Sequence, residues 1–454
     1  MRKIDATQAS FHTWTEIVMD RTNTPARELL ESLFFSAVRA AHPATVLPSN
    51  LPEPPTRGRL VILAAGKAAG SMTEVAEAHY VEKLPPERLA GLAVTRHGYG
   101  RKTRHIPVIE AGHPVPDKAG ISATRRVLRM AEAVDANDLV LVLLSGGASA
   151  NWIAPAPGLS LEEKQTVTRA LLRSGAAIGE MNTVRKHLSR IKGGRLAARA
   201  YPATVVTLAI SDVPGDDPAV IGSGPTVPDP TTLFDARAIV SRYRLGLPDA
   251  VTRALKEPGN ETPKPGDKVF SGSSYRILAR PADALRAAAD RARAAGYECV
   301  MLGDRVQGEA HEVAAEHARL AGELSAQHRR VVILSGGELT VTLRGKGRGG
   351  PNQEYALALA HQLDSAPGIA ALAADTDGTD GGGGRPDDPA GAFVDPTTVA
   401  RARSAGLDPA AFLADNDSTG FFNGIGDLFI PGPTFTNVTD FRAIVVDRSP
   451  VGGK

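Results

Sequence analysis

Short runs of leucine and β-branched residues alternate along the chain with longer amphipathic stretches. The runs "RLVILA" and "DLVLVLL" have the composition of buried strands. Apolar residues recur at helical spacing in other stretches, as in residues 26–41 and 161–176. Strands that alternate with helices of about 10–15 residues are typical of βαβ units. The pattern therefore predicts an α/β fold in which helices cover both faces of a parallel sheet.

The character of the chain changes at residues 255–268, where "LKEPGNETPKPGDK" is rich in proline, glycine and charge. We interpret this stretch as a linker. Beyond it a second α/β unit begins at "SYRILA" and ends with the strand "FRAIVV". Because 454 residues are too many for one ordinary core, we predict two domains, at residues 24–255 and 266–448. The first 23 residues show no clear pattern.

Composition and charge exclude several classes of function. The 52 basic and 50 acidic residues give a formal net charge of +2, and the basic residues are scattered. Proteins that bind nucleic acid or a membrane surface usually concentrate basic residues in one stripe, so we expect neither partner. The N-terminal stretch lacks the apolar core of a signal peptide. The single cysteine, Cys299, suits a reducing compartment. We expect a cytoplasmic protein.

Two of the buried strands run into the same Ser-Gly-Gly tripeptide. The candidate cofactor-binding residues at these points are Ser145, Gly146, Gly147 and Ser149 after the first strand, and Ser335, Gly336, Gly337 and Glu338 after the second. In an open parallel sheet, ligands bind beyond the carboxyl ends of the strands. Glycine exposes backbone N–H groups and serine adds a hydroxyl, so either turn could hold a phosphate. A tight turn without a ligand is the alternative. Neither stretch is a Walker A sequence.

Three charged residues lie at the ends of predicted strands or in a glycine-rich loop. Lys67 follows a strand between small residues and can neutralise a carboxylate or a phosphate. Asp212 ends another strand and can accept a proton or bind Mg²⁺. Arg348 lies between two glycines, on the kind of loop that offsets charge on a moving phosphoryl group. The alternatives are an exposed lysine on a turn and a solvated basic loop.

Other polar stretches offer weaker candidates. Asp375 and Asp377 lie in a Gly/Asp loop that could contact Mg²⁺ or merely turn the chain, and their spacing does not fit an EF-hand. Lys192 and Gly193 end the basic stretch "VRKHLSRIKGG". One of its cations could reach a phosphate, although we expect most of them on a solvated face. His113 lies in a proline-rich turn, where we expect a structural hydrogen bond.

Eight motifs follow one another along the chain: "GKAAGSM", "GHPVPD", "LLSGGASA", "NTVRKHLSRIKGGRLA", "SDVPGDDPAVIGSGPTVPD", "LSGGELTVTLRGKGRGGPNQE", "DTDGTDG" and "DNDSTGFF…GDLFIPGPTFTNVTD". In this order they resemble the family of glycerate 2-kinases whose C-terminal half is the MOFRL domain. The resemblance covers about residues 24–447. One departure is the acidic loop, in which extra glycines and charges follow Asp380.

The resemblance implies a Rossmann-like N-terminal domain and a smaller α/β C-terminal domain with the MOFRL region at about 331–447. It places the active site in the cleft between them. It further implies that ATP and Mg²⁺ serve to phosphorylate D-glycerate at its 2-hydroxyl, giving 2-phospho-D-glycerate and ADP. The family's active-site lysine, aspartate and arginine fall on Lys67, Asp212 and Arg348. Contacts to the metal would come from Asp212, Asp375 and Asp377.

D-glycerate and ATP are then the expected small-molecule partners, and a homodimer is compatible with the sequence. Relatives of this family have also carried the label hydroxypyruvate reductase. That activity needs a nicotinamide site, and the Rossmann fingerprint G-x-G-x-x-G is absent after "RLVILA". We therefore keep an NAD(P)H-dependent hydroxypyruvate reductase as the alternative function.

Overall fold

The computed structural model describes residues 24–382, 385 and 387–447. Its strands are β1 (Leu60–Ala65), β2 (Leu89–Arg96), β3 (Val108–Ala111), β4 (Leu139–Leu144), β5 (Thr204–Ile210), β6 (Ser273–Ala279), β7 (Glu298–Val306), β8 (Val331–Gly337), β9 (Ile369–Asp375), β10 (Gly391–Val394), β11 (Leu428–Phe429) and β12 (Asp440–Val446). Its α-helices are α2 (Pro25–Ala41), α3 (Pro43–Val46), α4 (Ala69–Tyr80), α5 (Lys118–Glu132), α6 (Ala148–Asn151), α7 (Leu161–Arg173), α8 (Ile178–His187), α9 (Arg195–Ala200), α10 (Leu233–Arg242), α11 (Asp249–Ala254), α12 (Pro281–Ala294), α13 (Ala310–Ala326), α14 (Pro351–Leu363), α15 (Thr398–Ser404), α16 (Pro409–Ala414) and α17 (Ser418–Ile425). Short 3₁₀ turns join some of them.

The first sheet has six strands in the order β3-β2-β1-β4-β5-β6, and every pair in it is parallel. This is the strand order of doubly wound nucleotide-binding sheets. All residues of β1 and β4 are buried, because helices cover both faces. The predicted α/β fold with a parallel sheet is confirmed. The order reverses between β1 and β4, so the loops after these two strands flank the crevice where ligands bind in such sheets.

The second sheet is mixed, with the order β11-β10-β9-β12-β8-β7. Its central strand β12 contains the predicted strand at 441–446 and runs antiparallel to both neighbours, β8 and β9. The carboxyl ends of β8 and β9 and the start of β12 therefore lie at one edge of the sheet. Residues that follow β8 and β9, and residues that precede β12, come together at that edge.

One strand lies in a different sheet from the one the sequence suggested. We expected the strand in "SYRILA" to open the second unit, but it forms β6 and pairs with β5 at the edge of the first sheet. The linker-like stretch before it also packs on the first domain. His187 of α8 contacts Glu261, and Thr262 donates a hydrogen bond to Asp229. A strand-like pattern indicates a strand but not its neighbour. The predicted domain ranges stay a prediction.

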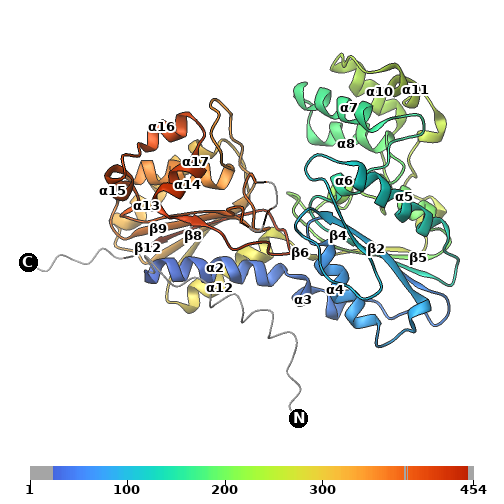
Figure 1. Ribbon diagram of the computed structural model, residues 1–454, viewed down its shortest axis with the longest axis horizontal. Coiled ribbons are helices and arrows are strands. Elements are labelled where there is room, and N and C mark those ends of the chain that lie inside the picture. The colour runs from blue at the N-terminus through green and yellow to red at the C-terminus, as the bar shows by residue number, and fades with distance from the viewer. Residues whose placement is uncertain (1–23, 383–384, 386, 448–454) are drawn as a thin grey trace, which may run out of the picture.

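Helix α2 joins the two domains, although it comes first among the described elements. It lies across the second domain, packed on α12, β9 and β12, and leads into α3, which contacts α4 of the first domain (Figure 1). Phe34 is fully buried, and its ring meets Phe429 and Phe441 edge to face at 4.9 and 5.8 Å. One apolar core runs from the first sheet through α2 and α12 to the second sheet.

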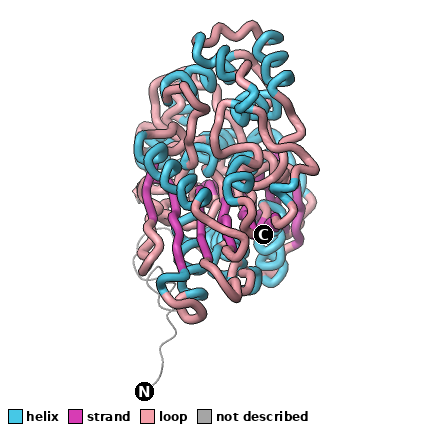
Figure 2. Tube along the Cα trace, turned by 90° about the vertical axis from the view of Figure 1, so that its right-hand side faces the viewer, coloured by secondary structure: helices cyan, strands magenta, loops and turns pink. Residues whose placement is uncertain are grey.

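Helices α7, α8, α10 and α11 form a layer of their own above α6 (Figures 1 and 2). A small separate core holds this helical layer together, with Val167, Leu171 and Val184 among its buried residues. Within the described part of the chain, we find no helix with the length and apolar character needed to cross a membrane.

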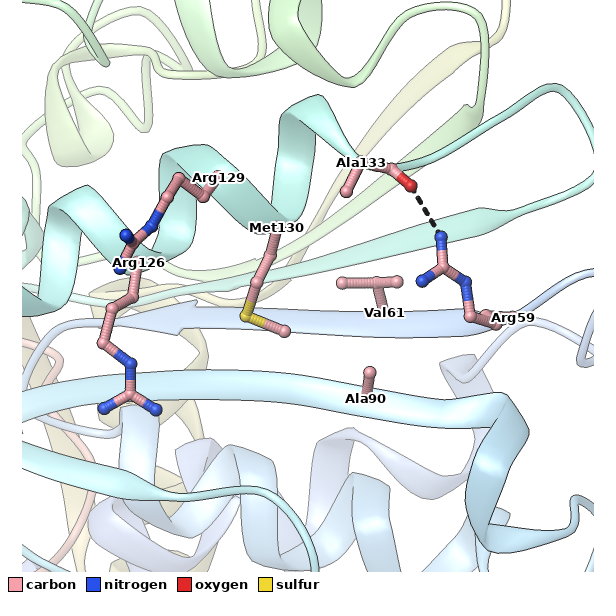
Figure 3. A pocket seen from close by; sticks show the side chains of 7 residues that line it. All are labelled: Arg59, Val61, Ala90, Arg126, Arg129, Met130 and Ala133. Atoms are coloured by element: carbon pink, nitrogen blue, oxygen red, sulfur yellow. Dashed lines mark hydrogen bonds between the residues drawn. The ribbon is translucent and has the colours of Figure 1, made fainter.

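A cavity of about 330 Å³ opens on the first domain (Figure 3). Val61 and Ala90, near the starts of β1 and β2, form its floor with Met130 of α5. Arg126 and Arg129 stand at its rim. This cavity lies at the amino ends of β1 and β2. Lys67, Asp212 and the first Ser-Gly-Gly tripeptide follow the carboxyl ends of their strands, at the opposite end of the sheet.

We predict that Phe34→Ala lowers the free energy of unfolding by about 3–5 kcal/mol, because it removes a buried ring from the shared core and leaves a cavity. Denaturant unfolding measures the change. The matched control is Phe234→Ala, since the Phe234 side chain is 71% exposed. An equal, small effect of both substitutions would contradict the central place of α2 in the core.

Candidate active site

The loops after β1 and β4 interlock at the point where the strand order reverses. The Lys67 backbone N–H donates to the Gly146 carbonyl at 2.7 Å, and the Ala68 N–H donates to Ser145 Oγ at 2.9 Å. A Cβ on Gly66, whose φ is +116°, would lie 2.4 Å from the carbonyl oxygen of Ser145. Only glycine fits there, which explains the residue before Lys67. The first Ser-Gly-Gly turn thus fixes the backbone of the lysine loop.

The Lys67 side chain forms an ion pair with Asp377 of the second domain. Its Nζ lies 2.6 Å from Asp377 Oδ2, and the Arg96 guanidinium lies 3.3 Å from the same oxygen. The Tyr99 hydroxyl donates to the Asp377 carbonyl at 2.8 Å. The Asp377 side chain is 0% exposed and that of Lys67 12% exposed. The two domains therefore meet at a buried cluster of charges, with two cations around one carboxylate.

The net effect of burial and neighbouring charges raises the pKa of Lys67 and lowers that of His113. Burial acts to lower the pKa of Lys67, but the nearby charges of Asp377, Asp375 and Asp212 outweigh it and raise the pKa. Lys67 is therefore charged at neutral pH. Burial, with the charge of Lys67, lowers the pKa of His113 to about 3, so its imidazole is neutral. The charged Lys67 side chain and the neutral His113 ring both lie beside Gly147.

Asp212 follows β5 and faces the same cluster. Its Oδ2 accepts a hydrogen bond of 2.8 Å from Asn437 Nδ2, a residue that precedes β12 in the second domain. A Cβ on Gly146 would lie 1.9 Å from this oxygen, so the first Ser-Gly-Gly turn packs directly against the carboxylate. Burial raises the pKa of Asp212, and the charge of Lys67 acts against the increase. The structure thus brings Lys67 and Asp212 together, as predicted.

Ser149, Ser223 and Lys192 form a second polar group beside the first. The Ser149 and Ser223 hydroxyls lie 2.7 Å apart, and Lys192 Nζ donates to the Ser149 carbonyl at 2.8 Å and to Ser223 Oγ at 3.4 Å. Gly193 donates its N–H to the Ser223 carbonyl. Burial, with the charges of Arg185 and Lys164, lowers the pKa of Lys192 well below its usual value. Burial and the nearby cations thus disfavour the charged form of the Lys192 amine.

The basic stretch that ends at Lys192 is not a solvated face. Lys186, His187 and Lys192 are all buried, and Lys186 forms an ion pair with Asp229 at 3.5 Å. Helix α8 turns this stretch toward α7, where Lys164 Nζ donates to the Leu188 carbonyl at 2.7 Å. The expectation of a solvated face was wrong because the helical layer covers α8. Charge alone does not show which side of a helix meets water.

The second Ser-Gly-Gly tripeptide does not form a turn, because its residues are the last three of β8 and are buried. The guanidinium of buried Arg442 donates to Ser335 Oγ at 3.2 Å and also to the Gly336 carbonyl. A Cβ on Gly337 would lie 2.2 Å from the Val306 carbonyl oxygen. Its glycines therefore serve the close approach of β7 and β8. Glu338, which follows, is exposed, and partial desolvation with the charges of Asp440 and Asp212 raises its pKa.

The carboxylates of the acidic loop accept hydrogen bonds from the loop itself and from the first turn of α14. Asp377 Oδ1 accepts the Thr379 N–H, and Asp375 Oδ1 accepts the Asp377 N–H. Asp380 is held at the first turn of α14, where Gln353 donates both its backbone N–H and its side-chain amide to Oδ2. Burial raises the pKa of Asp375, and the charge of Asp377 adds to the increase.

The fit to Mg²⁺ is partial. Among the described residues, no group of three or more His, Cys, Asp and Glu side chains is arranged to hold a metal ion. Asp377 does not fit as a ligand, because both of its oxygens are engaged. Asp212 and Asp375 each use only one oxygen in hydrogen bonds to other described residues. Since Mg²⁺ commonly binds one or two carboxylates plus substrate phosphates, these two fit such a site.

Arg348 lies on an exposed loop between β8 and α14. Within the described residues, its guanidinium makes no hydrogen bond or ion pair, so no contact joins it to Lys67 or Asp212. Its loop nevertheless borders the acidic loop, since a Cβ on Gly350 would lie 2.3 Å from Asp380 Oδ1. Arg348 therefore lies two residues before Gly350, which packs against Asp380 in the loop that carries Asp377.

Sequence reasoning missed Arg96 and Asn437, did not single out Ser223 within its loop, and misjudged His113. Within the described residues, no hydrogen bond is present on the His113 ring, so the expected structural hydrogen bond was wrong. Asn437 lies in the motif "PTFTNVTD" and Ser223 in "IGSGPT", both rich in glycine, proline or hydroxyl residues. Such loops were a usable signal. Arg96 is the last residue of β2, and Lys67 comes two residues after the end of β1. The rule that ligands bind at the carboxyl ends of parallel strands could therefore have found Arg96 as well.

Comparison with family models matches two stretches of the chain. Residues 29–256 match a domain of unknown function, DUF4147, and residues 331–440 match the MOFRL family. The second match contains the acidic loop and the Arg348 loop.

The chain is also similar to several named proteins over most of its length. It is 46% identical over 442 residues to a protein of Agrobacterium vitis named "Putative hydroxypyruvate reductase", covering 96% of each chain. It is 38% identical over 419 residues to the D-glycerate 2-kinase of Thermotoga maritima, covering 91% of this chain and 97% of that one. The crystal structure of glycerate kinase from Thermotoga maritima superposes with a TM-score of 0.81 at 36% identity, covering 93% of this chain and 99% of that one.

We predict that Asp377→Asn destabilises the protein more than Lys67→Met. Loss of the carboxylate leaves two buried cations without their counter-charge, whereas loss of the lysine leaves Asp377 paired with Arg96. Breaking a buried ion pair from one side costs about 3–5 kcal/mol. Denaturant unfolding of both variants measures the difference. Asp387→Asn is the control, because its ion pair with Arg385 lies in the same segment and is exposed. A larger loss from Lys67→Met would contradict the charge assignment.

Proposed function

The chain belongs to the glycerate kinase family with a MOFRL domain, and we propose that it transfers a phosphoryl group from ATP to the 2-hydroxyl of D-glycerate. The products are 2-phospho-D-glycerate and ADP. The observation that carries the proposal is the meeting of Lys67 and Asp212 at the point where the strand order reverses, closed from the second domain by Asp377 and Asn437.

The proposed roles follow from the charges of these side chains. Lys67 binds the carboxylate of glycerate; an ammonium has three donors, so it can do this while it stays paired with Asp377. Asp212 accepts the proton of the attacking 2-hydroxyl, and burial, by raising its pKa, makes it a better base than an exposed aspartate. His113, neutral and beside Lys67, is placed to hydrogen-bond the substrate.

We assign the phosphates of ATP to the first Ser-Gly-Gly turn and its neighbours. Ser145, Gly146, Gly147 and Ser149 line one side, and Lys192 and Gly193 the other. A polyphosphate would supply the negative charge that Lys192 lacks among its neighbours. The proposal leaves out Ser335, Gly336 and Gly337, because Arg442 and the strand β7 occupy their polar groups and space. Glu338 stays at the rim of the site.

When bound with the nucleotide, Mg²⁺ would neutralise phosphate charge, and Asp375 would hold it, because the unpaired oxygen of Asp212 is assigned to the substrate proton. Arg348 would offset charge on the transferred phosphoryl group. Phosphoryl transfer depends mainly on positioning and on charge stabilisation, so a site divided between two domains can be completed when they close on the substrates.

The second candidate is a hydroxypyruvate reductase, favoured by the name of the similar Agrobacterium vitis proteins. This activity requires a nicotinamide cofactor. The turn after β1 reads Gly66-Lys67-Ala68-Ala69-Gly70-Ser71, so Ala68 and Ser71 stand where the dinucleotide fingerprint G-x-G-x-x-G has its second and third glycines. The backbone N–H groups of Lys67 and Ala68 in this turn already donate hydrogen bonds to Gly146 and Ser145. We rank the kinase first on this ground.

We predict that the purified protein forms ADP from ATP in the presence of D-glycerate and Mg²⁺, and that the product is the 2-phosphate. Coupled detection of ADP, followed by NMR of the product, measures both. Asp212→Asn should lower kcat by about 10²–10⁴, the usual contribution of a general base. Asp217→Asn is the control, since Asp217 is exposed and caps a turn. Oxidation of NADH by hydroxypyruvate, without ADP formation from glycerate, would overturn the proposal.

We also predict that Lys192→Met raises the KM for ATP about 10–100-fold and leaves the KM for glycerate nearly unchanged, which corresponds to about 1.4–2.8 kcal/mol of binding. Without nucleotide, the variant should be as stable as the parent or more so, because a buried amine whose charged form is disfavoured is replaced by an apolar side chain of similar length. Steady-state kinetics and thermal unfolding measure the two effects. Lys256→Met, on the exposed surface of the same domain, is the control. An unchanged KM for ATP would contradict the phosphate assignment.

A further inference from the structure

The loop that carries Arg348 is held by a single short segment of the chain. We call residues 342–350 the basic loop and residues 415–417, Asp-Asn-Asp, the clamp. The basic loop connects β8 to α14, and no residue of it belongs to a helix or strand. Without a ladder or a helix, its conformation depends on whatever else accepts its backbone N–H groups.

The clamp accepts five consecutive backbone N–H groups of the basic loop. Asn416 Oδ1 accepts those of Arg344 at 2.7 Å and Gly345 at 3.0 Å. Asp415 accepts the next two, from Lys346 at its Oδ1 and from Gly347 at its carbonyl.

The fifth N–H group is that of Arg348 itself, which donates to Asp417 Oδ1 at 3.1 Å. The Arg348 carbonyl in turn accepts the N–H of Thr419. Both backbone polar groups of the arginine are therefore fixed, although its side chain is exposed.

Close packing explains the glycines of "RGKGRGG". A Cβ on Gly345 would lie 2.2 Å from the Asp415 carbonyl oxygen, and a Cβ on Gly347 would lie 2.3 Å from Asp417 Cβ. The glycines lie flat against the clamp, and the residues between them, Arg344, Lys346 and Arg348, are exposed. Successive side chains of an extended chain point to opposite sides. The clamp thus decides which side the three basic side chains occupy.

Asn416 also connects the basic loop to the helix that holds the acidic loop. Its Nδ2 donates to Glu354 Oε1 of α14 at 3.3 Å, and its side chain is buried. The first turn of the same helix binds Asp380, in the loop that carries Asp377. Asn416 has a φ of +53°, a conformation that asparagine tolerates better than most residues. The basic and acidic loops are therefore fastened to one helix.

We propose that Asn416 is a positioning residue: through the backbone of the basic loop it sets Arg348 to meet the phosphoryl group in transfer. This inference rests on the proposed function, in which Arg348 stabilises that group. Asn416 acts through the arginine and does not touch the substrate. Asp417, which holds the Arg348 N–H, supports the same geometry.

The test compares Asn416→Gly with its parent in the full-length protein. Glycine keeps the left-handed backbone and removes every side-chain hydrogen bond of the clamp's central residue. We expect kcat to fall about 10–100-fold, the effect of a misplaced catalytic group, while the KM for D-glycerate changes less than about 3-fold. Asn416→Asp, which keeps the accepting Oδ1, should recover part of the loss. His328→Gly is the matched control, because His328 has the same backbone conformation, with a φ of +54°, on an exposed turn far from the clamp in sequence.

A double-mutant cycle separates positioning from a general loss of structure. Arg348→Ala alone should lower kcat about 10³-fold or more, and adding Asn416→Gly to it should cause no further loss. A kcat for Asn416→Gly within about 2-fold of the parent would overturn the inference. So would the same fractional loss in both backgrounds.

Two further outcomes keep the inference distinct from the proposed function. If Arg348→Ala keeps normal activity, the role of the arginine in the proposed function fails, and the positioning role of Asn416 fails with it. If Arg348→Ala is inactive and Asn416→Gly is not, only the positioning role fails. If Asn416→Gly unfolds at the assay temperature, Asp417→Ser replaces it: serine still caps α17 but is too short to reach the Arg348 N–H, and the same fall in kcat is expected.

Discussion

The buried ion pair between Lys67 and Asp377 joins the loops of the two domains where their strand ends meet. A charge taken out of water is tolerated only when it is paired and hydrogen-bonded. Each partner comes from a different sheet, so neither domain can satisfy its own charge alone. Asp377 lies in a loop that Asp380 fastens to the first turn of α14. The pair therefore connects the crevice of the first sheet to the helix beside the Arg348 loop.

This charge arrangement also leaves room for a substrate. Lys67 and Arg96 bring two positive charges to the single carboxylate of Asp377. Asp375 lies close by, but burial and the charge of Asp377 disfavour its ionised form. A small carboxylate bound at Lys67 would share this positive charge with Asp377, and the carboxyl of Asp212 also lies close to the lysine. An anionic polyphosphate would likewise favour the charged form of Lys192, which burial and the nearby cations disfavour without it.

The sequence was a good guide to residues fixed by local rules and a poor guide to contacts between distant segments. Lys67 and Asp212 follow buried strands, and parallel strands bring their carboxyl ends to one edge, so their meeting could be predicted. Nothing local marks Asp377 as the partner of Lys67, because the two lie in different sheets. The two Ser-Gly-Gly tripeptides look alike, yet one forms a turn and the other packs β8 against β7. Which role a glycine has depends on the neighbour that approaches it. In the same way, the sequence of β6 indicates a strand but not that it pairs with β5 in the first sheet.

The central claim is that Lys67, Asp212 and the Arg348 loop act on one bound substrate at the junction of the domains. A crystal structure of the protein with D-glycerate, Mg²⁺ and a non-hydrolysable ATP analogue tests it most directly. The account predicts that the glycerate carboxylate lies within hydrogen-bonding distance of Lys67 Nζ, with its 2-hydroxyl at Asp212 and the terminal phosphate of the analogue facing Arg348. Glycerate bound away from Lys67, as in the cavity at the amino ends of β1 and β2, would contradict it.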